Sequence, residues 1–242
     1  MTLSRPVAHL AAVGRRLARA RRQRGIVGTL REAGRMVAST RSRRRTARWE
    51  RRFDSEWGID TAGIVRLTSL DIESANRDHG VRYQATDPNH FHALVDGLDV
   101  DPRDFVFVDV GSGKGRVVVL AARESFARVI GVEFSPDLDA VARRNVARLP
   151  PELRRNGRIR LLTMDATEFE LPSAPLVLYF FNPFDDAVLQ VVLDRIRESA
   201  SVDPRPIYLL FTGPLSELPA ARAELRALGA ASHAGVAYEV RL

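Results

Sequence analysis

Residues 105–122 have the sequence Phe-Val-Phe-Val-Asp-Val-Gly-Ser-Gly-Lys-Gly-Arg-Val-Val-Val-Leu-Ala-Ala, the most informative segment of the chain. Its apolar first part, rich in valine and phenylalanine, predicts a buried strand that ends at Asp109. Three alternating glycines follow, and Val117–Ala122 then continues without a helix-breaking residue, which predicts a buried helix. Because glycine has no Cβ, this turn is expected to bring bare backbone N–H groups up against a ligand.

The spacing of the glycines distinguishes three kinds of loop. A Walker phosphate loop requires Ser or Thr after its lysine, whereas here Gly115 follows Lys114. A dinucleotide fingerprint requires glycine at position 116, where this chain has Arg116. The observed Gly-x-Gly-x-Gly pattern behind an acid resembles motif I of the class I S-adenosylmethionine (SAM) dependent methyltransferases. This resemblance implies cofactor contacts by Asp109, Gly111, Ser112, Gly113, Gly115 and Arg116.

Polar residues also follow the next two predicted strands. Residues 128–133 form an apolar run that ends in Glu133, where a carboxylate can accept hydrogen bonds from both ribose hydroxyls. In the methyltransferase family the acid after motif I has this role, and Glu133 is at the matching position. A third strand, residues 159–163, precedes Asp165 and Ala166. These two residues resemble the family's adenine-contacting segment, with the acid toward the exocyclic amine and the next N–H toward the ring.

A fourth predicted strand, residues 175–181, leads into Asn182-Pro183-Phe184. This segment resembles motif IV of the amino-methyltransferases, Asp/Asn-Pro-Pro-Tyr/Phe, but has one proline instead of two. The resemblance implies that Asn182 contacts SAM and accepts a hydrogen bond from the target nitrogen, while Phe184 flanks a methylated cation. A strand-to-helix turn with an asparagine cap and core phenylalanines explains the same residues, so both interpretations remain open.

Further cofactor candidates lie outside these motifs. In this family the helices before motif I commonly close over the methionine end of SAM. By that resemblance Tyr83 and Thr86 line the cofactor site. The expected cofactor set also includes Phe134, which directly follows Glu133. A second interpretation of Thr86-Asp87-Pro88 is a helix start, with Thr or Asp as the cap and proline in the first turn of an amphipathic helix from about Phe91 to Leu98.

The histidines give weaker indications. His90 and His92 form a His-x-His pair, but i and i+2 positions diverge on a helix and no third ligand is near, so we predict no metal site. His79 would be a general base if it reached the pocket. The chain has no cysteine, which excludes disulfides, thiolate metal sites and cysteine nucleophiles.

Positive charge is concentrated at the N-terminus. Residues 1–52 contain 16 Arg and two acids, a net charge of +14, whereas the remaining residues carry −7. This asymmetry favours an anionic partner for residues 1–52, either nucleic acid or a membrane surface, although a solvated tail and an organelle transit peptide are alternatives. No apolar run reaches the roughly 20 residues needed to span a bilayer. A cytoplasmic location is expected.

From residue 105 onward, predicted strands and helices alternate, which predicts an α/β fold with a doubly wound, mostly parallel sheet. The expected helices are 115–124, 136–148, 185–199 and 217–228, with a further strand at 206–212. Gly229–Leu242 resembles the family's closing antiparallel hairpin, with His233–Gly235 as its turn. The expected domains are a basic, helical or disordered arm (1–48), a helical pre-core cap (49–98) and a SAM-binding core (99–242).

The expected function is methyl transfer from SAM, whose rate depends mainly on holding donor and acceptor in line. A neutral amine acceptor needs no obligatory general base. The acceptor stays open between a protein side chain, a nucleic acid such as RNA, and a small molecule. A non-catalytic SAM-binding or nucleic-acid-associated module is the main alternative. An NAD-dependent oxidoreductase is disfavoured by the position of the third glycine.

Overall fold

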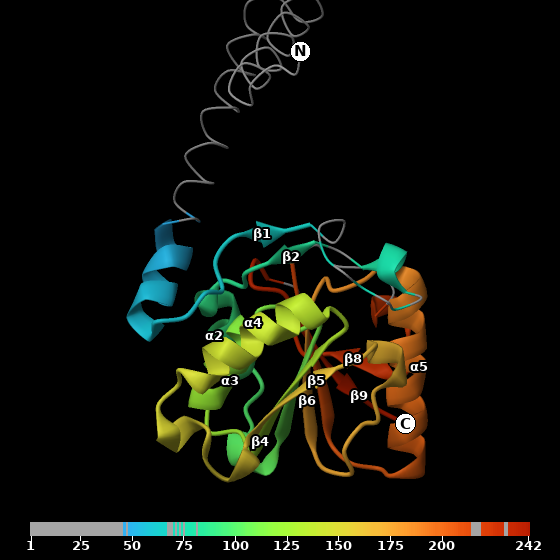
Figure 1. The fold of residues 1–242 in the computed structure, drawn as a ribbon. Coiled ribbons are helices and arrows are strands. Elements are labelled where there is room, and N and C mark those ends of the chain that lie inside the picture. Colours follow the sequence, from blue (N-terminus) through green and yellow to red (C-terminus); the bar gives the residue numbers. More distant parts are fainter. Residues whose placement is uncertain are drawn as a thin grey trace, which may run out of the picture. The chain divides into compact units, whose positions relative to one another are not determined.

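The computed structural model describes residues 46, 48–66, 70, 72, 74, 76–80, 82–213, 219–229 and 232–242 (Figure 1). The chain divides into two units, Met1–Arg51 and Arg52–Leu242. Within the first unit the described residues, 46 and 48–51, are helical. The basic arm expected over residues 1–48 therefore lies almost entirely outside the described residues, and the following paragraphs concern the second unit.

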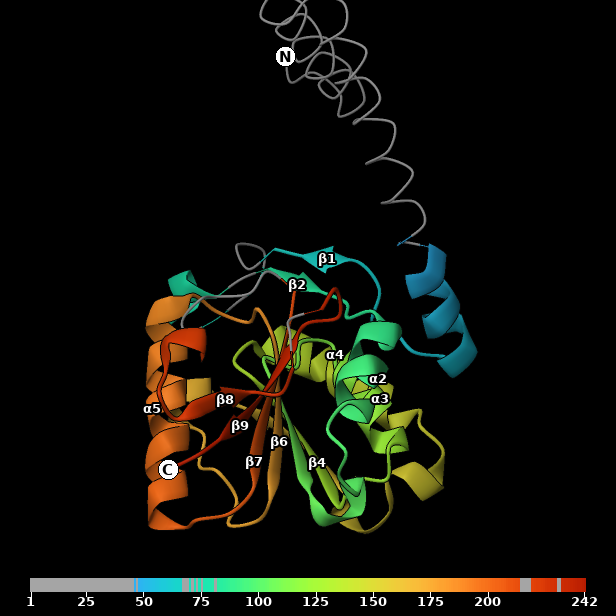
Figure 2. The same cartoon turned by 180° about the vertical axis from the view of Figure 1, so that it is seen from behind.

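The second unit is built on a seven-stranded sheet (Figures 1 and 2). Its strands are β3 (Val106–Val110), β4 (Arg128–Glu133), β5 (Ile159–Thr163), β6 (Leu176–Phe181), β7 (Ile207–Thr212), β8 (Leu225–Ala227) and β9 (Val236–Val240). The order across the sheet is β5-β4-β3-β6-β7-β9-β8. The first five strands are parallel, and β9 is antiparallel to both β7 and β8. The predicted fold class, a mostly parallel sheet with a closing antiparallel hairpin, is confirmed.

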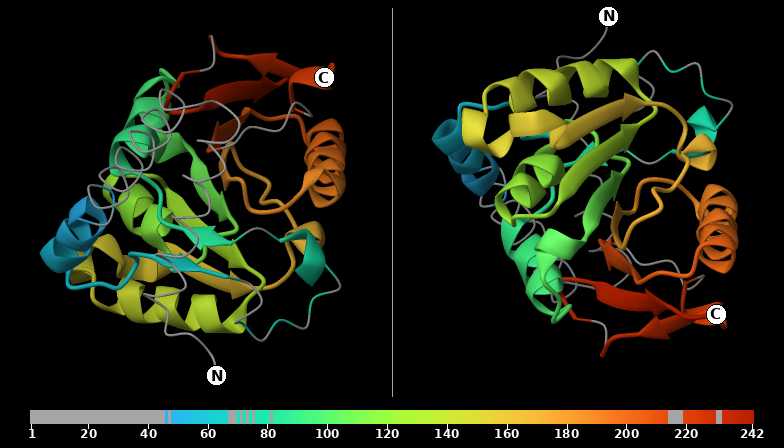
Figure 3. Two further views of the ribbon diagram at one scale, coloured as in Figure 1. Left: turned by 90° about the horizontal axis from the view of Figure 1, so that it is seen from above. Right: turned by 90° about the horizontal axis from the view of Figure 1, so that it is seen from below.

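Helices cover both faces of this sheet (Figure 3). They are α2 (Pro88–Asp96), α3 (Arg116–Arg123), α4 (Pro136–Ala147) and α5 (Asp186–Val202), in addition to a helical stretch at residues 52–57. One face packs against α2 and α3 in a cluster that includes Phe91, Phe107 and Val118. The opposite face packs against α5 in a cluster that includes Val108, Leu178 and Ile196. β3 and β6 are therefore buried on both sides, which explains their nearly continuous apolar sequence.

Each helix after a strand begins at a residue suited to cap it. Ser135 accepts a hydrogen bond from the Leu138 N–H before α4, and Asp185 accepts from the first turn of α5. The cap interpretation of Thr86-Asp87-Pro88 is confirmed, because Asp87 accepts from the Asn89 N–H and Pro88 is the first residue of α2. α2 thus begins three residues earlier than expected and ends at Asp96.

The helix predicted over residues 217–228 is wrong in its described part. Residues Pro219–Ala221 form one 3-10 turn, and Leu225–Ala227 is strand β8, paired with β9 from Leu225↔Val240 to Ala227↔Tyr238. Leu225 packs against the core while Arg226 is exposed and bonds Glu239 across the hairpin. This pairing overrides the helix-favouring local composition. The hairpin therefore starts at Leu225, and its expected turn, His233–Gly235, lies within the longer connection to β9.

The remaining described segments are short. β1 (Ile64–Val65) and β2 (Tyr83–Gln84) form a separate two-stranded antiparallel sheet. Single 3-10 turns occur at η2 (Arg77–His79), η3 (Pro102–Asp104), η4 (Pro151–Leu153), η5 (Arg155–Gly157) and η6 (Ala166–Glu168). None of the helices in the described residues combines the length and apolarity that crossing a bilayer would require.

Candidate functional site

A pocket lies at the carboxyl ends of the central strands. The strand order reverses between β3 and β6, the place where doubly wound sheets bind ligands. The pocket encloses about 850 Å³ free of protein atoms, part of it open to solvent. Thirteen of the fourteen predicted site residues line it: Tyr83, Thr86, Asp109, Gly111, Ser112, Gly113, Arg116, Glu133, Phe134, Asp165, Ala166, Asn182 and Phe184. Gly115 does not line it, because it caps α3 and faces Ala142 of α4.

The first two glycines of the loop allow other segments to lie directly against it. Gly111 and Gly113 have φ of 80° and 53°, in the left-handed region. A Cβ on Gly111 would be 2.4 Å from Cβ of Pro183, and a Cβ on Gly113 would be 2.3 Å from Cδ2 of Tyr83. Pro183 and Tyr83 therefore close the pocket from two sides at positions that only a glycine loop permits.

The backbone N–H groups of this loop are bonded within the protein. Gly111 and Ser112 both donate to the carbonyl of Val132 at 2.9 Å. Gly113 donates to Oε2 of Glu133 at 2.7 Å. The expectation that these groups face a ligand is therefore wrong for Gly111, Ser112 and Gly113.

Two buried carboxyl groups lie next to each other on β3 and β4. Glu133 is 3% exposed and accepts from the N–H groups of Gly113 and Ser135, at 2.7 and 2.9 Å. Burial raises the pKa of Glu133 to about 7, although these backbone hydrogen bonds lower it. Burial, and then the charge of Glu133, raise the pKa of Asp109 well above its usual range. The two groups are desolvated carboxyls that line the pocket, and their raised pKa values favour the protonated forms.

Asp165 connects the pocket to the segment before β2. Its Oδ2 accepts from the Ser74 hydroxyl and from Nδ2 of Asn76 at 3.0 Å, and its Oδ1 accepts from Thr167. Although burial raises the pKa of Asp165, these hydrogen bonds together hold it below the usual range. Ser74 and Asn76 were not among the predicted site residues, and no sequence motif marks them.

The same segment is tied to the acceptor side of the pocket. Gly80 forms a β-bridge with Phe184, and the Asp185 N–H donates to the carbonyl of His79 at 2.9 Å. Nδ1 of His79 lies 2.7 Å from Oδ2 of Asp185, and this hydrogen bond, followed by the carboxylate's charge, raises the pKa of His79. His79 does not line the pocket but lies beside two residues that do, Gly80 and Phe184.

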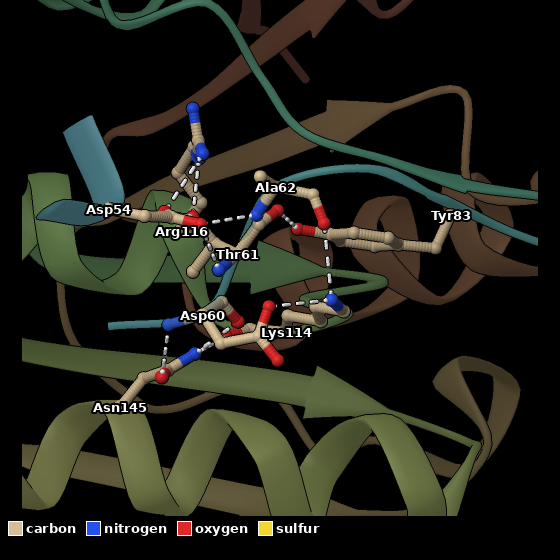
Figure 4. A network of polar contacts seen from close by, with 8 residues as sticks. All are labelled: Asp54, Asp60, Thr61, Ala62, Tyr83, Lys114, Arg116 and Asn145. Atoms are coloured by element: carbon tan, nitrogen blue, oxygen red, sulfur yellow. Dashed lines mark hydrogen bonds and ion pairs between the residues drawn. The ribbon is translucent and has the colours of Figure 1, made fainter. Parts of the chain in front are cut away.

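A polar network anchors the pre-core segment to the glycine loop (Figure 4). Arg116 is 2% exposed; its Nη2 lies 3.1 Å from Oδ1 of Asp54, and its Nε donates to the Thr61 hydroxyl at 2.7 Å. The carbonyl of Thr61 accepts from the Tyr83 hydroxyl at 2.5 Å. Arg116 therefore holds the segment that positions Tyr83 against Gly113.

Lys114, the only lysine of the chain, belongs to the same network. Its Nζ donates to Oδ1 of Asp60 at 3.0 Å and to the Ala62 carbonyl at 3.1 Å. Asn145 of α4 completes the contacts by bonding the Asp60 backbone in both directions, at 2.9 Å each (Figure 4). Lys114 is therefore directed toward the pre-core segment and is absent from the pocket lining.

Asn182 is the polar group at the acceptor side. It has φ of 43°, an uncommon conformation for a residue other than glycine. Asn182 is half-buried and lines the pocket, and its side-chain amide makes no hydrogen bond to any residue that the structure describes. Asparagine tolerates the left-handed conformation better than most residues, so the backbone here needs no further explanation.

Several lining residues were not predicted. Most lie next to predicted residues or on the segment before β2, namely Asn76, Gly80, Arg82, Gln84, Val117, Val132, Met164, Phe181 and Pro183. The other two, Leu138 and Val188, lie in the first turns of α4 and α5. The apolar members Met164 and Leu138 flank the ends of β5 and β4, where they supply the nonpolar walls of a ligand site.

The remaining histidines do not gather into a ligand set. Nδ1 of His92 lies 3.1 Å from Oε1 of Glu124, and the ring of His90 meets the edge of His233. Across the described ranges, no group of three or more potential metal-ligating side chains is present.

A protein-family model matches the central part of the chain. Residues 107–200 match a methyltransferase domain. This range begins in β3 and ends in α5, so it contains the glycine loop, Glu133, Asp165 and Asn182. A comparison with curated proteins gave no match.

Solved structures with similar folds include several methyltransferases. One, described as an RNA methyltransferase from Salinibacter ruber in complex with S-adenosyl-L-homocysteine, is 24% identical over 64% of this chain and 92% of its own, with a TM-score of 0.45. A putative methyltransferase, yhhF, from Escherichia coli is 15% identical over 74% of this chain and 99% of its own, with a TM-score of 0.47. A predicted N6-adenine-specific DNA methylase from Listeria monocytogenes is 15% identical over 64% and 51%, with a TM-score of 0.48. These distant likenesses assign no acceptor.

Proposed function

We propose that this chain is a class I S-adenosylmethionine-dependent methyltransferase, as the match of residues 107–200 to a methyltransferase domain supports, and that it methylates a nitrogen atom held at Asn182. One observation carries the proposal. The glycine loop, Glu133, Asp165 and Asn182 come from four different strand ends, and they all line one pocket at the switch point of the sheet. A ligand in this pocket could therefore form hydrogen bonds with several polar groups while one of its ends lies beside Asn182.

The residues present fit SAM. Gly111, Ser112 and Gly113 line the pocket, and the carboxyl groups of Glu133 and Asp165 offer acceptors suited to ribose hydroxyls and to an adenine amine. Met164 and Phe134 supply apolar walls. When bound, SAM supplies an electrophilic methyl group on a sulfonium.

Three of the lining residues would bind and enclose SAM. Glu133 holds the ribose, and Asp165 holds the adenine amine in competition with Ser74 and Asn76, which already donate to its Oδ2. Tyr83 covers the glycine loop and excludes water from one side of the pocket. The chain thereby fixes the donor's position, which is the main contribution an enzyme makes to an in-line displacement.

At the acceptor side, Asn182 orients the nucleophile. Its amide oxygen accepts a hydrogen bond from an amine N–H, which fixes the direction of the nitrogen lone pair. The aromatic ring of Phe184 packs beside the nitrogen and stabilises the positive charge that develops on it. A protein amine, a nucleobase and a small-molecule amine all have this chemistry.

The acceptor class can be tested with isotope-labelled SAM. We expect the purified chain to transfer a labelled methyl group to a component of a cell extract, with a label that resists mild base, as N-methyl groups do. Digestion of the product with ribonuclease or protease then identifies nucleic acid, protein or small molecule. A base-labile label would indicate a carboxylate ester and would contradict the nitrogen acceptor.

Asn182→Ala should lower the rate of this transfer by about 10–100-fold, because one hydrogen bond to the nucleophile, worth about 1–3 kcal/mol, is lost. The affinity for SAM, measured by calorimetry, should change much less than the rate. An Asn182→Ala variant with unchanged transfer would remove Asn182 from the acceptor site. The matched control is Asn89→Ala, since Asn89 lies on α2 and does not line the pocket.

Binding of 5′-methylthioadenosine should strengthen with pH. This ligand carries the adenine and ribose but lacks the titratable amino acid part of SAM. Because the pKa of Glu133 is raised to about 7, its carboxylate is mostly protonated at pH 6 and mostly ionised at pH 8. The ionised form accepts both hydroxyls, so affinity should rise about tenfold between these pH values.

Glu133→Gln is the control for this pH dependence. The variant should bind more weakly at pH 8 and show a nearly flat profile, which separates Glu133 from the neighbouring Asp109. A profile that stays steep in the variant would assign the titration to another group. The raised pKa also means that the stability contributed by Glu133 is greatest below pH 4.5 and falls as pH rises through about 7.

The N-terminal part of the chain lies outside the matched methyltransferase domain. We propose that residues 1–48 are a basic arm and that residues 1–52 dock an anionic partner, on the basis of their net charge of +14. Residues 49–98 would cap the core, as Tyr83 does against Gly113. Deleting residues 1–48 should leave SAM binding intact.

A further inference from the structure

A second hollow lies at the opposite ends of the strands from the proposed SAM pocket. It encloses about 800 Å³ free of protein atoms, part of it open to solvent. Its lining consists of Ala127, Arg128, Arg155, Gly157, Arg158 and Arg160. Arg128 is the first residue of β4 and Arg158 directly precedes β5, whereas the SAM pocket lies where these strands end. We call this second site the arginine hollow.

The strand register brings two of these arginines to one face of the sheet. Ile130 of β4 pairs with Arg160 of β5. Arg128 and Ile130 are two residues apart on β4, so Arg128 shares the face of Arg160. Arg158 belongs to the turn that enters β5, and its carbonyl accepts from the Val129 N–H at 2.8 Å.

Nothing in the described residues neutralises these charges. None of the four arginines forms an ion pair with a described residue, and the lining contains no Asp or Glu. Arginines elsewhere on the same body do have carboxylate partners, for example Arg143 with Asp139 and Arg226 with Glu239. Like charges on adjacent strands repel and lower stability. The body carries a net charge of −7 over residues 53–242, so acids are not scarce.

Arg158 contributes an independent observation. Its Nε donates to the carbonyl of Phe126 at 2.9 Å, which fixes the plane of the guanidinium. Its Nη2 is buried and has no hydrogen-bond partner in the described part of the chain. Burial also lowers the pKa of Arg158, because desolvation disfavours the charged form. A buried donor usually has a partner, so part of the hydrogen-bonding capacity of this guanidinium is unused at a residue that lines the hollow.

We propose that the arginine hollow binds phosphate groups, through the guanidinium groups of Arg128, Arg155, Arg158 and Arg160. The planar guanidinium fork matches phosphate oxygens in pairs, and these bonds are charge-assisted. The lining contains no aromatic side chain on which a base could stack. The ligand is therefore recognised through its phosphates, which are supplied either by a free diphosphate or by a phosphodiester backbone.

The test compares two double variants of the full-length chain. Arg128→Gln/Arg160→Gln removes two charges from the hollow but leaves Arg158 and its bond to Phe126 in place. Arg144→Gln/Arg197→Gln removes two exposed arginines from α4 and α5, outside the hollow, and thus controls for net charge and for binding by the basic N-terminus. Calorimetry at about 150 mM salt measures the binding of pyrophosphate and of a 12-nucleotide single-stranded RNA.

We expect the hollow variant to bind at least one of these ligands tenfold or more weakly than the control variant. Loss of pyrophosphate binding alone identifies a free diphosphate as the ligand. Loss of RNA binding, with a reduced salt dependence, identifies a phosphodiester backbone. Equal affinities of the two variants for both ligands would overturn the proposal. Both variants should bind SAM with the same affinity. The test of phosphate binding by the arginine hollow is therefore independent of the methyltransferase assignment.

Discussion

Arg116→Met is expected to lower the free energy of unfolding of the body by about 3 kcal/mol, because breaking a buried ion pair leaves the Asp54 carboxylate without its counter-charge. Three hydrogen bonds from Thr61 and Ala62 to this carboxylate remain, which holds the loss to the lower end of the usual range. The Arg116 side chain is 2% exposed and that of Asp54 is 11% exposed. The substitution also removes the hydrogen bond to Thr61 and the contact of the guanidinium with the Phe53 ring, 4.6 Å from its centroid. A loss of this size is a large fraction of the roughly 5–15 kcal/mol that stabilises a typical domain.

The control for this variant is Arg123→Met on the same helix. Arg123 also stacks on an aromatic ring, Trp57, at 4.6 Å, but it is exposed and has no ion-pair partner among the described residues. Its replacement should cost about 1 kcal/mol or less. Denaturant unfolding of the two variants provides the comparison. Equal losses would show that the Arg116–Asp54 pair does not hold the pre-core segment to the core.

Gly113→Ala is expected to weaken SAM binding by a hundredfold or more. The new Cβ would lie 2.3 Å from Tyr83 at a φ of 53°, so either Tyr83 or the loop must move. Displacement of Tyr83 breaks its hydrogen bond to Thr61, and displacement of the loop breaks the bond from Gly113 to Glu133. Either movement deforms the pocket, and the left-handed backbone adds about 1–2 kcal/mol of strain.

The control variant Gly58→Ala distinguishes the effect of a steric clash with Tyr83 from the effect of backbone strain alone. Gly58 has φ of 64°, and a Cβ there would meet nothing within 4 Å. This variant should lose about 1–2 kcal/mol of stability and keep its affinity for SAM. Calorimetric titration of both folded variants measures the difference. If Gly113→Ala bound SAM as tightly as Gly58→Ala, the contact between Tyr83 and the loop would have no part in the site.

The central sheet and most of the pocket could be predicted from the sequence because their signals are local. Buried parallel strands are apolar throughout, and each ends at a residue that the sheet brings to the same edge. Asp109, Glu133 and Asn182 were therefore found from their positions in the chain. The polar residue at or near the end of each strand can be located without knowledge of distant contacts.

Other parts could not be predicted because distant partners determine them. Leu225–Ala227 lies in a helix-favouring sequence but forms a strand by pairing with β9. Asn76 lies beside Asp165, 89 residues away, and nothing in its sequence neighbourhood indicates this contact. The N–H groups of the glycine loop were expected to face a ligand, but Val132 and Glu133 accept them. In each case the structure differs from the prediction because of hydrogen bonds between residues far apart in the sequence.

The most direct test of the account is a calorimetric titration of the purified chain with SAM, S-adenosylhomocysteine and NAD. The loop spacing, the two carboxyl groups of Glu133 and Asp165 and the methyltransferase domain over residues 107–200 all predict binding of both adenosyl ligands and none of NAD. Binding of NAD without SAM, or of neither, would contradict the assignment of this pocket and the methyl transfer derived from it.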